Sequence, residues 1–341
     1  MRADASAPTR QRNARPKGPE KPRRMRIKDY FWPVVGLGAV AVSAWLLYHE
    51  WREISLEDVW SGLAAIPPHA WALSALSSII AYAALAGYDH IALTHLGKRV
   101  SWLFVTVCSF TTYALSHNIG GSVFSGAVIR YRAYASKGLT GQDVGVLVGI
   151  CWFTFVLSSV FVGGVVLLIE PSVLDRYTEG SHEGWWIALG IAMLLFVGAY
   201  VFGSWLHLKP LAIRKFRLQY PSLPIVARQL VIGPLEILAA AAIIFFALPA
   251  ENNPGFIVVL GIFLFSFAMA QASHAPGGLG VLEVVFLTGL SEMDPAAVLA
   301  ALLVFRLFYL IIPLVLGIVA VLAFEHSQFG RGSRSGREGD M

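Results

Sequence analysis

The sequence predicts an all-α polytopic membrane protein, and three observations support this prediction. Of its 341 residues, 56% are hydrophobic and only 14% are charged, whereas a soluble domain carries roughly a quarter charged residues. Eight apolar runs follow one another along the chain, and a helix of roughly 20 such residues spans a bilayer core. The loops between the runs separate into acidic and basic ones. The eight runs are residues 30–49, 70–91, 102–124, 143–169, 185–206, 225–248, 254–290 and 295–324.

The first 29 residues hold ten of the 26 lysines and arginines. We expect residues 1–29 to form a disordered basic cytosolic tail close to anionic lipid heads, rather than a nucleic-acid-binding segment. The apolar run that follows is too long for a cleaved signal peptide, and no small-residue cleavage site follows it. Residues 325–341 are expected to form a second cytosolic tail.

Loop charges decide how many runs cross the membrane. Basic loops favour the cytosol, yet eight simple crossings would place the acidic loop 170–183 inside and the basic stretch 209–217 outside. Both loops agree with the rule if residues 102–137 form a re-entrant hairpin that breaks at 116–121, and residues 254–290 form another that breaks at 273–280. The sequence therefore predicts about six full spans plus two re-entrant helical hairpins, with both termini in the cytoplasm of a bacterial inner membrane.

The two halves of the membrane domain 30–324 are predicted to form an inverted repeat. Residues 30–169 and 185–324 have the same order of span, span, hairpin and span, in opposite membrane orientations. The break sequences also match, with Ser-His-Asn-Ile-Gly-Gly at 116–121 and Ser-His-Ala-Pro-Gly-Gly at 273–278. Inverted repeats with broken helices at mid-membrane are a transporter architecture. Chance similarity among small residues is the alternative.

Helix starts at the two breaks would direct free N–H groups into the protein, where they favour a phosphate. A guanidinium binds phosphate oxygens in bidentate fashion, and Arg130 follows the first break by about two turns. The alternative for Arg130 is an anchor at the cytosolic surface. The predicted lipid-phosphate residues are Arg130, Arg306, Gly120, Gly121, Gly277 and Gly278.

Acidic residues within apolar runs are candidates for binding a headgroup amine or for proton coupling, because a charge at membrane depth is costly. Glu283 falls in a helix first turn, where capping is the alternative role. Glu236 and Arg306 lie near the middle of their runs and are expected to form a buried pair, which could be purely structural. Asp89 could be an ordinary interfacial acid. The candidates for substrate binding or proton coupling are Asp89, Glu236, Glu283, His117, His274 and Tyr309.

Enzyme signatures are missing from the sequence. It has no zinc-ligand spacing, no Gly-x-Ser-x-Gly elbow and no phosphate-binding Gly-Lys-Ser/Thr. We therefore expect no catalytic residue, metal or cofactor. Cys108 and Cys151 lie in apolar runs, so a disulfide is not expected. Residues 209–219 alternate apolar and basic side chains and are expected to form a short amphipathic helix on the inner leaflet, as a lipid-gathering element or a simple anchor.

Several motifs together resemble a known family. They are Gly87-Tyr88-Asp89, the segment 113–134 with Val128-Ile129-Arg130-Tyr131, Pro-Gly-Gly-Leu-Gly-Val-Leu-Glu at 276–283, and Arg306 to Tyr309 followed by Pro313. This combination resembles the membrane flippase domain of the lysylphosphatidylglycerol synthase/flippase, the multiple peptide resistance factor. The resemblance extends over most of 30–324, and it implies importance for intramembrane acids at Asp89, Glu236 and Glu283.

The resemblance implies a lipid transporter that moves an anionic or aminoacylated phospholipid, such as lysylphosphatidylglycerol, between leaflets. Full-length members continue into a cytosolic aminoacyltransferase, whereas this chain ends shortly after residue 324 and is expected to keep transport and lack synthesis. The alternatives are an intramembrane lipid-modifying enzyme and an accessory or scaffold protein of envelope biogenesis. Expected partners are a phospholipid headgroup and the membrane, with a homo-oligomer or a separate synthase as further options and no nucleic acid.

Overall fold

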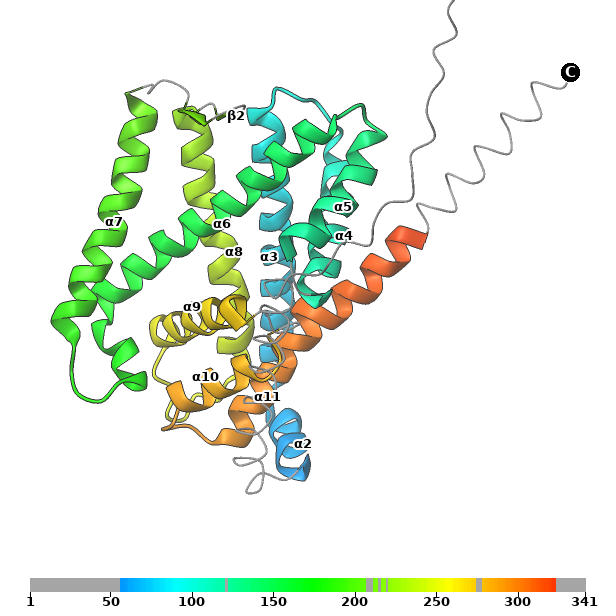
Figure 1. Ribbon diagram of the computed structural model, residues 1–341. Helices are drawn as coiled ribbons and strands as arrows, with labels where there is room; N and C mark the ends of the chain where they lie inside the picture. Colours follow the sequence, from blue (N-terminus) through cyan, green and yellow to red (C-terminus); the bar gives the residue numbers. More distant parts are fainter. Residues whose placement is uncertain are drawn as a thin grey trace, which may run out of the picture.

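The computed structural model describes residues 56–119, 122–206, 211–213, 216–218, 220–273 and 278–322. Figure 1 shows these residues as a bundle of helices with one small β-hairpin. The elements are α2 (Leu56–Ala65), α3 (Pro68–His95), α4 (Trp102–Ile119), α5 (Ser122–Ala135), α6 (Gly141–Ile169), η1 (Pro171–Tyr177), α7 (Glu183–Trp205), β1 (Leu211–Ile213), β2 (Phe216–Leu218), α8 (Leu223–Ala247), α9 (Phe256–Ser273), α10 (Val281–Gly289), α11 (Pro295–Phe305) and η3 (Arg306–Ile311).

Six of the described helices are long and apolar enough to cross a membrane. Five of them are α3, α6, α7, α8 and the continuous helix Pro295–Leu322, and they coincide with predicted full spans. The sixth is α9, which the sequence assigned to the second hairpin. Outward faces of these helices carry large apolar side chains, such as Leu195 of α7 at 67% exposure. The prediction of an all-α polytopic membrane protein is confirmed, while the predicted tails 1–29 and 325–341 and the span 30–49 lie outside the described residues.

Both predicted helix breaks occur where the sequence places them. α4 ends at Ile119 and α5 begins at Ser122, and the two helices pack against each other. α9 ends at Ser273 and α10 begins at Val281, again as a packed pair. At the second break Gly278 has φ +64° and Gly280 has φ +80°, left-handed conformations that glycine adopts without steric cost. In Figure 1 the α4–α5 pair lies toward the β2 end of the molecule and the α9–α10 pair toward the α2 end.

The order of long helix, hairpin and long helix occurs twice along the described chain. It is made first by α3, α4–α5 and α6, and then by α8, α9–α10 and the helix that starts with α11. Figure 1 shows that α3 runs toward the β2 end whereas α8 starts there and runs the other way. The two sets therefore point in opposite directions. The repeat boundaries 30–169 and 185–324 stay a prediction, since part of the first half lies outside the described residues.

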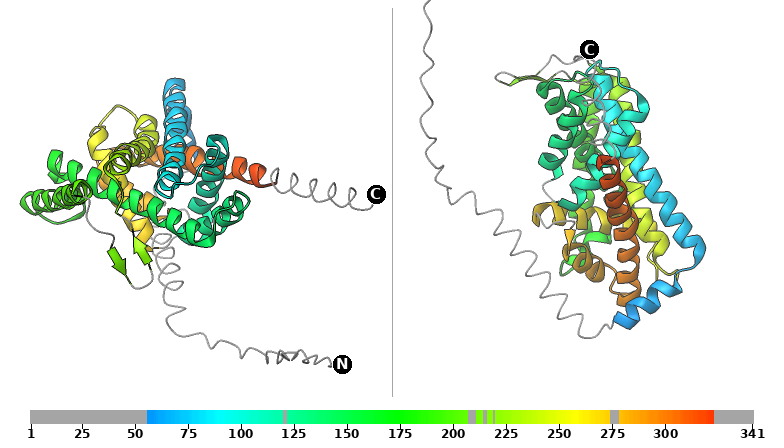
Figure 2. Two further views of the ribbon diagram at one scale, coloured as in Figure 1. Left: turned by 90° about the horizontal axis from the view of Figure 1, so that it is seen from above. Right: turned by 90° about the vertical axis from the view of Figure 1, so that its right-hand side faces the viewer.

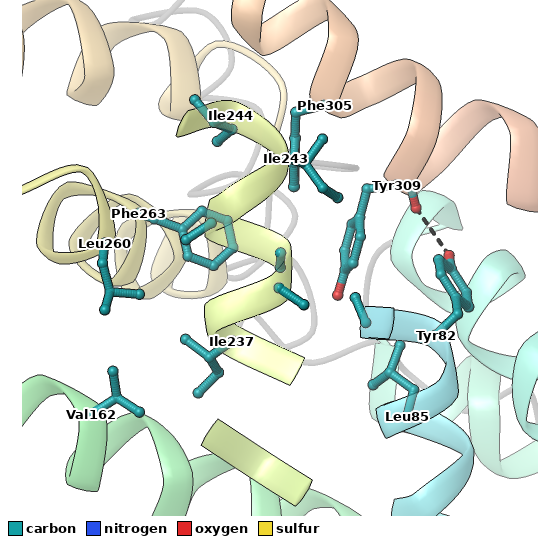
Figure 3. Packing of buried hydrophobic residues seen from close by; sticks show 14 of the residues in the cluster. Tyr82, Leu85, Val162, Ile237, Ile243, Ile244, Leu260, Phe263, Phe305 and Tyr309 are labelled. Atoms are coloured by element: carbon teal, nitrogen blue, oxygen red, sulfur yellow. Dashed lines mark hydrogen bonds between the residues drawn. The ribbon is translucent and has the colours of Figure 1, made fainter. Parts of the chain in front are cut away.

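Helices α3 and α8 form the centre of the bundle. Ile237, Ile243 and Ile244 of α8 are fully buried, and Figure 3 shows them among side chains of α3, α6, α9 and the 295–322 helix. Close approach depends on glycine. A Cβ at Gly87 would lie 2.7 Å from Ile232 Cγ2, and one at Gly233 would lie 1.7 Å from Ser158 Oγ of α6. Figure 2 shows α7 at the outer edge of the molecule beside α6.

The predicted amphipathic helix at 209–219 is wrong, because this stretch contains a β-hairpin. β1 pairs antiparallel with β2, and Leu211 opposes Leu218 while Ile213 opposes Phe216. The large apolar residues, Leu211 and Ile213 in β1 and Phe216 and Leu218 in β2, are two positions apart, which is the period of a strand and not the 3.6-residue period of a helix. The alternation that suggested an amphipathic helix therefore fits a hairpin better.

Candidate functional site

The first buried charge pair joins α3 to α5. Arg130 Nη2 donates to Asp89 Oδ1 at 2.7 Å, and Arg130 Nε lies 3.3 Å from Oδ1 and 3.2 Å from Oδ2. Tyr134, one turn after Arg130, donates its hydroxyl to Asp89 Oδ2 at 2.8 Å, and the thiol of Cys151 donates to Oδ1 at 3.4 Å. The guanidinium also lies 4.7 Å from the centre of the Tyr113 ring. Both carboxylate oxygens and one face of the guanidinium are thus occupied.

This pair lies inside the helix bundle. Asp89 is 0% exposed and Arg130 is 4% exposed, so neither side chain is an exposed surface anchor. Buried charges need a partner and further hydrogen bonds to offset desolvation. The hydroxyl of Tyr134 was not recognised from the sequence, although its position four residues after Arg130 places it on the same helix face.

The second charge pair joins α10 to η3. Arg306 donates two hydrogen bonds to Glu283 Oε1, from Nε at 2.8 Å and from Nη2. Glu283 Oε2 accepts the backbone N–H of Gly280 at 2.9 Å, so the same carboxylate caps the start of α10. The side chains are 11% and 14% exposed for Arg306 and Glu283. The predicted pairing of Arg306 with Glu236 is therefore wrong, since Glu283 reaches Arg306 instead.

Glu236 is the third intramembrane acid, and its surroundings differ from those of the other two. Its side chain lies in the middle of α8 and is 3% exposed. Its carboxylate accepts the hydroxyl of Tyr309 at 2.7 Å and that of Tyr88 at 3.5 Å. Among the described residues no Lys, Arg or His forms an ion pair with it. Glu236 therefore accepts hydrogen bonds from two tyrosines, whereas Asp89 and Glu283 each accept hydrogen bonds from an arginine.

A π-helical turn positions Arg306 and Tyr309. Residues 306–311 form this turn immediately before Pro313, and proline has no N–H for the carbonyl one turn earlier. Three side chains from α3 and α4 donate hydrogen bonds to backbone carbonyls of this turn. The donors are Ser78 to Phe308 O at 2.7 Å, Tyr82 to Tyr309 O at 2.9 Å and Asn118 to Leu310 O at 3.2 Å. Figure 3 shows the Tyr82–Tyr309 bond. π turns often occur at functional sites.

His117, near the end of α4, brings the first hairpin to this turn. Its ring stacks on Tyr309 with centroids 5.3 Å apart and an interplanar angle of 16°. Its Nδ1 atom is buried and has no hydrogen-bond partner in the described part of the chain. Tyr309 therefore contacts Glu236 through its hydroxyl and His117 through its ring face.

The structure thus places eight of the twelve predicted site residues and groups seven of them. Asp89 lies with Arg130, Glu283 with Arg306, and Glu236 and His117 with Tyr309. The eighth, Gly278, is at the second break, close to the Glu283 end of α10. The predicted site residues Gly120, Gly121, Gly277 and His274 lie outside the described residues. Sequence analysis missed Tyr82 and Ser78, whose one-turn spacing on α3 was the available signal.

The described residues thus contain two buried or partly buried charge pairs and one acid bound by tyrosines, between the long helices α3 and α8, the two helical hairpins and the π turn. The family model for the lysylphosphatidylglycerol synthase TM region matches residues 34–317. The chain belongs to this family. The matched residues of this chain include every element from α2 to η3, and therefore both charge pairs and Glu236.

Similar proteins differ in how much of their own length this chain of the lysylphosphatidylglycerol synthase TM family matches. The chain is 30% identical over 271 residues to the uncharacterized protein slr0712 of Synechocystis sp., covering 77% of this chain and 82% of that one. It is 27% identical over 284 residues to the inner membrane protein YbhN of Escherichia coli, covering 80% and 86%. The phosphatidylglycerol lysyltransferase of Staphylococcus haemolyticus is 26% identical over 323 residues, which are 90% of this chain but 35% of that protein.

Proposed function

We propose that this membrane protein is a bacterial inner-membrane lipid transporter that moves an anionic or aminoacylated phospholipid between leaflets, with both termini in the cytoplasm. The observation that carries the proposal is the Glu283–Arg306 pair, held partly exposed between the restart of a broken helix and a π turn. Membership of a family named for lysylphosphatidylglycerol synthase, and likeness to an inner membrane protein, support this lipid class and location.

The chemistry of the two arginines supports phosphate binding. Each guanidinium already binds a carboxylate through two nitrogens, Arg130 to Asp89 and Arg306 to Glu283. A phosphate presents oxygens in the same arrangement, so it can replace the carboxylate on either arginine. The released Asp89 or Glu283 is then available to a headgroup amine. Backbone N–H groups near Gly120, Gly121, Gly277 and Gly278, with His117 and His274, are proposed to complete this site.

Movement between leaflets requires the site to open to each side in turn. A charged headgroup cannot cross hydrocarbon unaided, because its desolvation costs far more than thermal energy. The opposite directions of α3 and α8, each followed by a hairpin, support alternating access by rocking of the two halves. Exchange of arginine from carboxylate to phosphate and back would keep the guanidinium paired during this movement, and the amine of an aminoacylated headgroup would pair the released carboxylate.

Exchange of labelled lipids in proteoliposomes tests the proposal. Short-chain fluorescent phosphatidylglycerol, lysylphosphatidylglycerol and phosphatidylcholine are placed in the inner leaflet, and albumin extracts the molecules that reach the outer leaflet. We expect faster extraction of the first two lipids than from empty vesicles, and no such gain for phosphatidylcholine. Equal extraction rates from vesicles with and without the protein, for all three lipids, would contradict transport.

The two rival functions predict other outcomes in the same vesicles. A lipid-modifying enzyme would change the chemical structure of the labelled lipid, which thin-layer chromatography detects in detergent without any second compartment. A scaffold protein would leave exchange at the empty-vesicle rate, yet its deletion would change lipid sidedness in cells. We expect no chemical change of the labelled lipid. We also expect the Arg306→Gln variant to change lipid sidedness in cells in the same way as deletion of the protein.

A further inference from the structure

Glu236 occupies an enclosed position that fits a proton better than a lipid group. Its two carboxylate oxygens accept Tyr309 at 2.7 Å and Tyr88 at 3.5 Å, and the residue is 3% exposed. A lipid ammonium would have to displace both hydroxyls inside the packed core of α3 and α8. A proton needs no such space. Because no described cation forms an ion pair with Glu236, binding a proton removes the desolvation cost of its buried charge.

The elements packed against α8 leave Glu236 with few titratable neighbours. α8 contacts α3, α6, α7, α9 and α11. α9 and α11 contain no acidic, basic, Tyr or Cys residue. On α7, Tyr200 donates to Gln229 and Glu183 lies in the first turn, and on α6, Cys151 donates to Asp89 and Asp143 caps the helix start. The groups that face Glu236 are therefore Tyr82 and Tyr88 of α3 and Tyr309 of η3.

Tyr309 links Glu236 to both hairpins. Its hydroxyl donates to Glu236, its ring stacks on His117 of the first hairpin, and it follows Arg306 by three residues on the same π turn. Arg306 in turn binds Glu283 of the second hairpin. The backbone carbonyl of Tyr309 accepts the hydroxyl of Tyr82. The residue that donates to Glu236 and the residue that binds Glu283 thus lie on one turn.

We propose that Glu236 is a proton-binding site whose loading and release control the Glu283–Arg306 pair and so couple lipid movement to a proton gradient, an inference that rests on the proposed transport function. As a carboxylate, Glu236 accepts from both tyrosines. When hydronium delivers a proton, the new O–H must donate, and one tyrosine contact has to rearrange. The proton later leaves to water on the other side, and no bond other than O–H forms or breaks.

Infrared difference spectroscopy of the reconstituted protein tests proton binding independently of transport. We expect a carbonyl stretching band of a protonated carboxylic acid that changes with pH in the wild type and in Glu283→Gln, and that is lost in Glu236→Gln. Tyr309→Phe keeps the carboxyl group but removes its 2.7 Å partner, so the band is expected to shift in frequency. The same band in Glu236→Gln, with the same pH response, would overturn the proposal.

Lipid exchange under an imposed pH gradient tests the coupling. The probe is short-chain fluorescent phosphatidylglycerol in vesicles whose membrane potential is clamped with potassium and valinomycin. We expect the gradient to accelerate net movement severalfold in the wild type and in Gly198→Ala, a variant with nothing near the added methyl group. Glu236→Gln is expected to lose this acceleration.

The outcomes separate the two proposals. Exchange without a gradient effect, in wild-type vesicles, would overturn coupling but leave transport intact. A titrating Glu236 band without any exchange would retain the proton site and overturn transport. Thermal unfolding of Glu236→Gln in detergent checks its fold. If that variant does not fold, Tyr309→Phe serves for both measurements. A carboxyl band at the wild-type frequency in Tyr309→Phe would then overturn the proton site.

Discussion

Arg306 donates two guanidinium hydrogen bonds to one carboxylate oxygen of Glu283, just after the second helix break, while the other oxygen accepts the N–H of Gly280. Glu283 therefore has two roles, because it pairs a cation and caps α10. Opening the pair separates an arginine from a carboxylate at a helix start. This is the arrangement on which the transport proposal depends.

Neutralising Glu283 alone is expected to destabilise the protein more than neutralising both partners. In Glu283→Gln the guanidinium of Arg306 loses its two hydrogen bonds to the Glu283 carboxylate, which should lower the free energy of unfolding by about 1–3 kcal/mol. The double variant Glu283→Gln/Arg306→Gln removes both charges and should recover about 1 kcal/mol of that loss. Denaturation in mixed detergent micelles measures these differences. Strictly additive losses would show that the two side chains do not interact.

Removing the charge of Asp89 should be more severe, because this pair is fully buried. Asp89→Asn leaves Arg130 as an uncompensated buried charge, at a cost of about 3–5 kcal/mol. Tyr134→Phe removes one neutral donor at 2.8 Å and should cost about 1 kcal/mol. Thermal unfolding in detergent compares the two variants, and equal stability of Asp89→Asn and wild type would refute a buried, charged pair.

The approach of α8 to α6 should tolerate no side chain at Gly233. Its Cβ would lie 1.7 Å from Ser158 Oγ and 2.7 Å from Ser158 Cβ, so Gly233→Ala is expected to cost about 1–3 kcal/mol or more through overpacking. Adding Ser158→Gly makes room and should restore part of the loss. The matched control is Gly198→Ala on α7, where no atom lies within 4 Å and stability should not fall.

The π turn predicts a compensating pair of substitutions. Tyr82→Phe leaves the carbonyl of Tyr309 without its 2.9 Å donor and should cost about 1–2 kcal/mol. Pro313→Ala restores an N–H one turn later that can bind this carbonyl. The double variant should therefore be more stable than Tyr82→Phe, as judged by its unfolding midpoint. A double variant less stable than the single one would contradict this account of the turn.

Much of the fold follows from one-dimensional signals. Lengths of apolar runs predicted the spans, because bilayer thickness fixes helix length. Glycine-rich stretches predicted both breaks, since Gly278 and Gly280 adopt conformations that other residues avoid. The candidate acids and arginines were recognised because a charge within an apolar run has few uses besides function or pairing.

Partner choice could not be predicted in the same way. Glu236 and Arg306 seemed matched because both lie near the middle of a run, but depth along a helix says nothing about rotation around it. Arg306 is the first residue of the π turn, and on its side of the helix Glu283 of α10 reaches it. The tyrosines that donate to Glu236 come from two elements, Tyr309 from η3 and Tyr88 from α3, and only tertiary packing brings them together.

The most direct measurement of the central claim is leaflet exchange of fluorescent phosphatidylglycerol in vesicles that contain wild type, Glu283→Gln/Arg306→Gln or Gly198→Ala. The double variant removes the charges of the partly exposed pair but keeps amides of similar shape, so its fold should be retained. We predict exchange near the empty-vesicle rate for the double variant and at the wild-type rate for Gly198→Ala. Exchange by a folded double variant as fast as that of the wild type would contradict the claim that this pair handles the lipid headgroup.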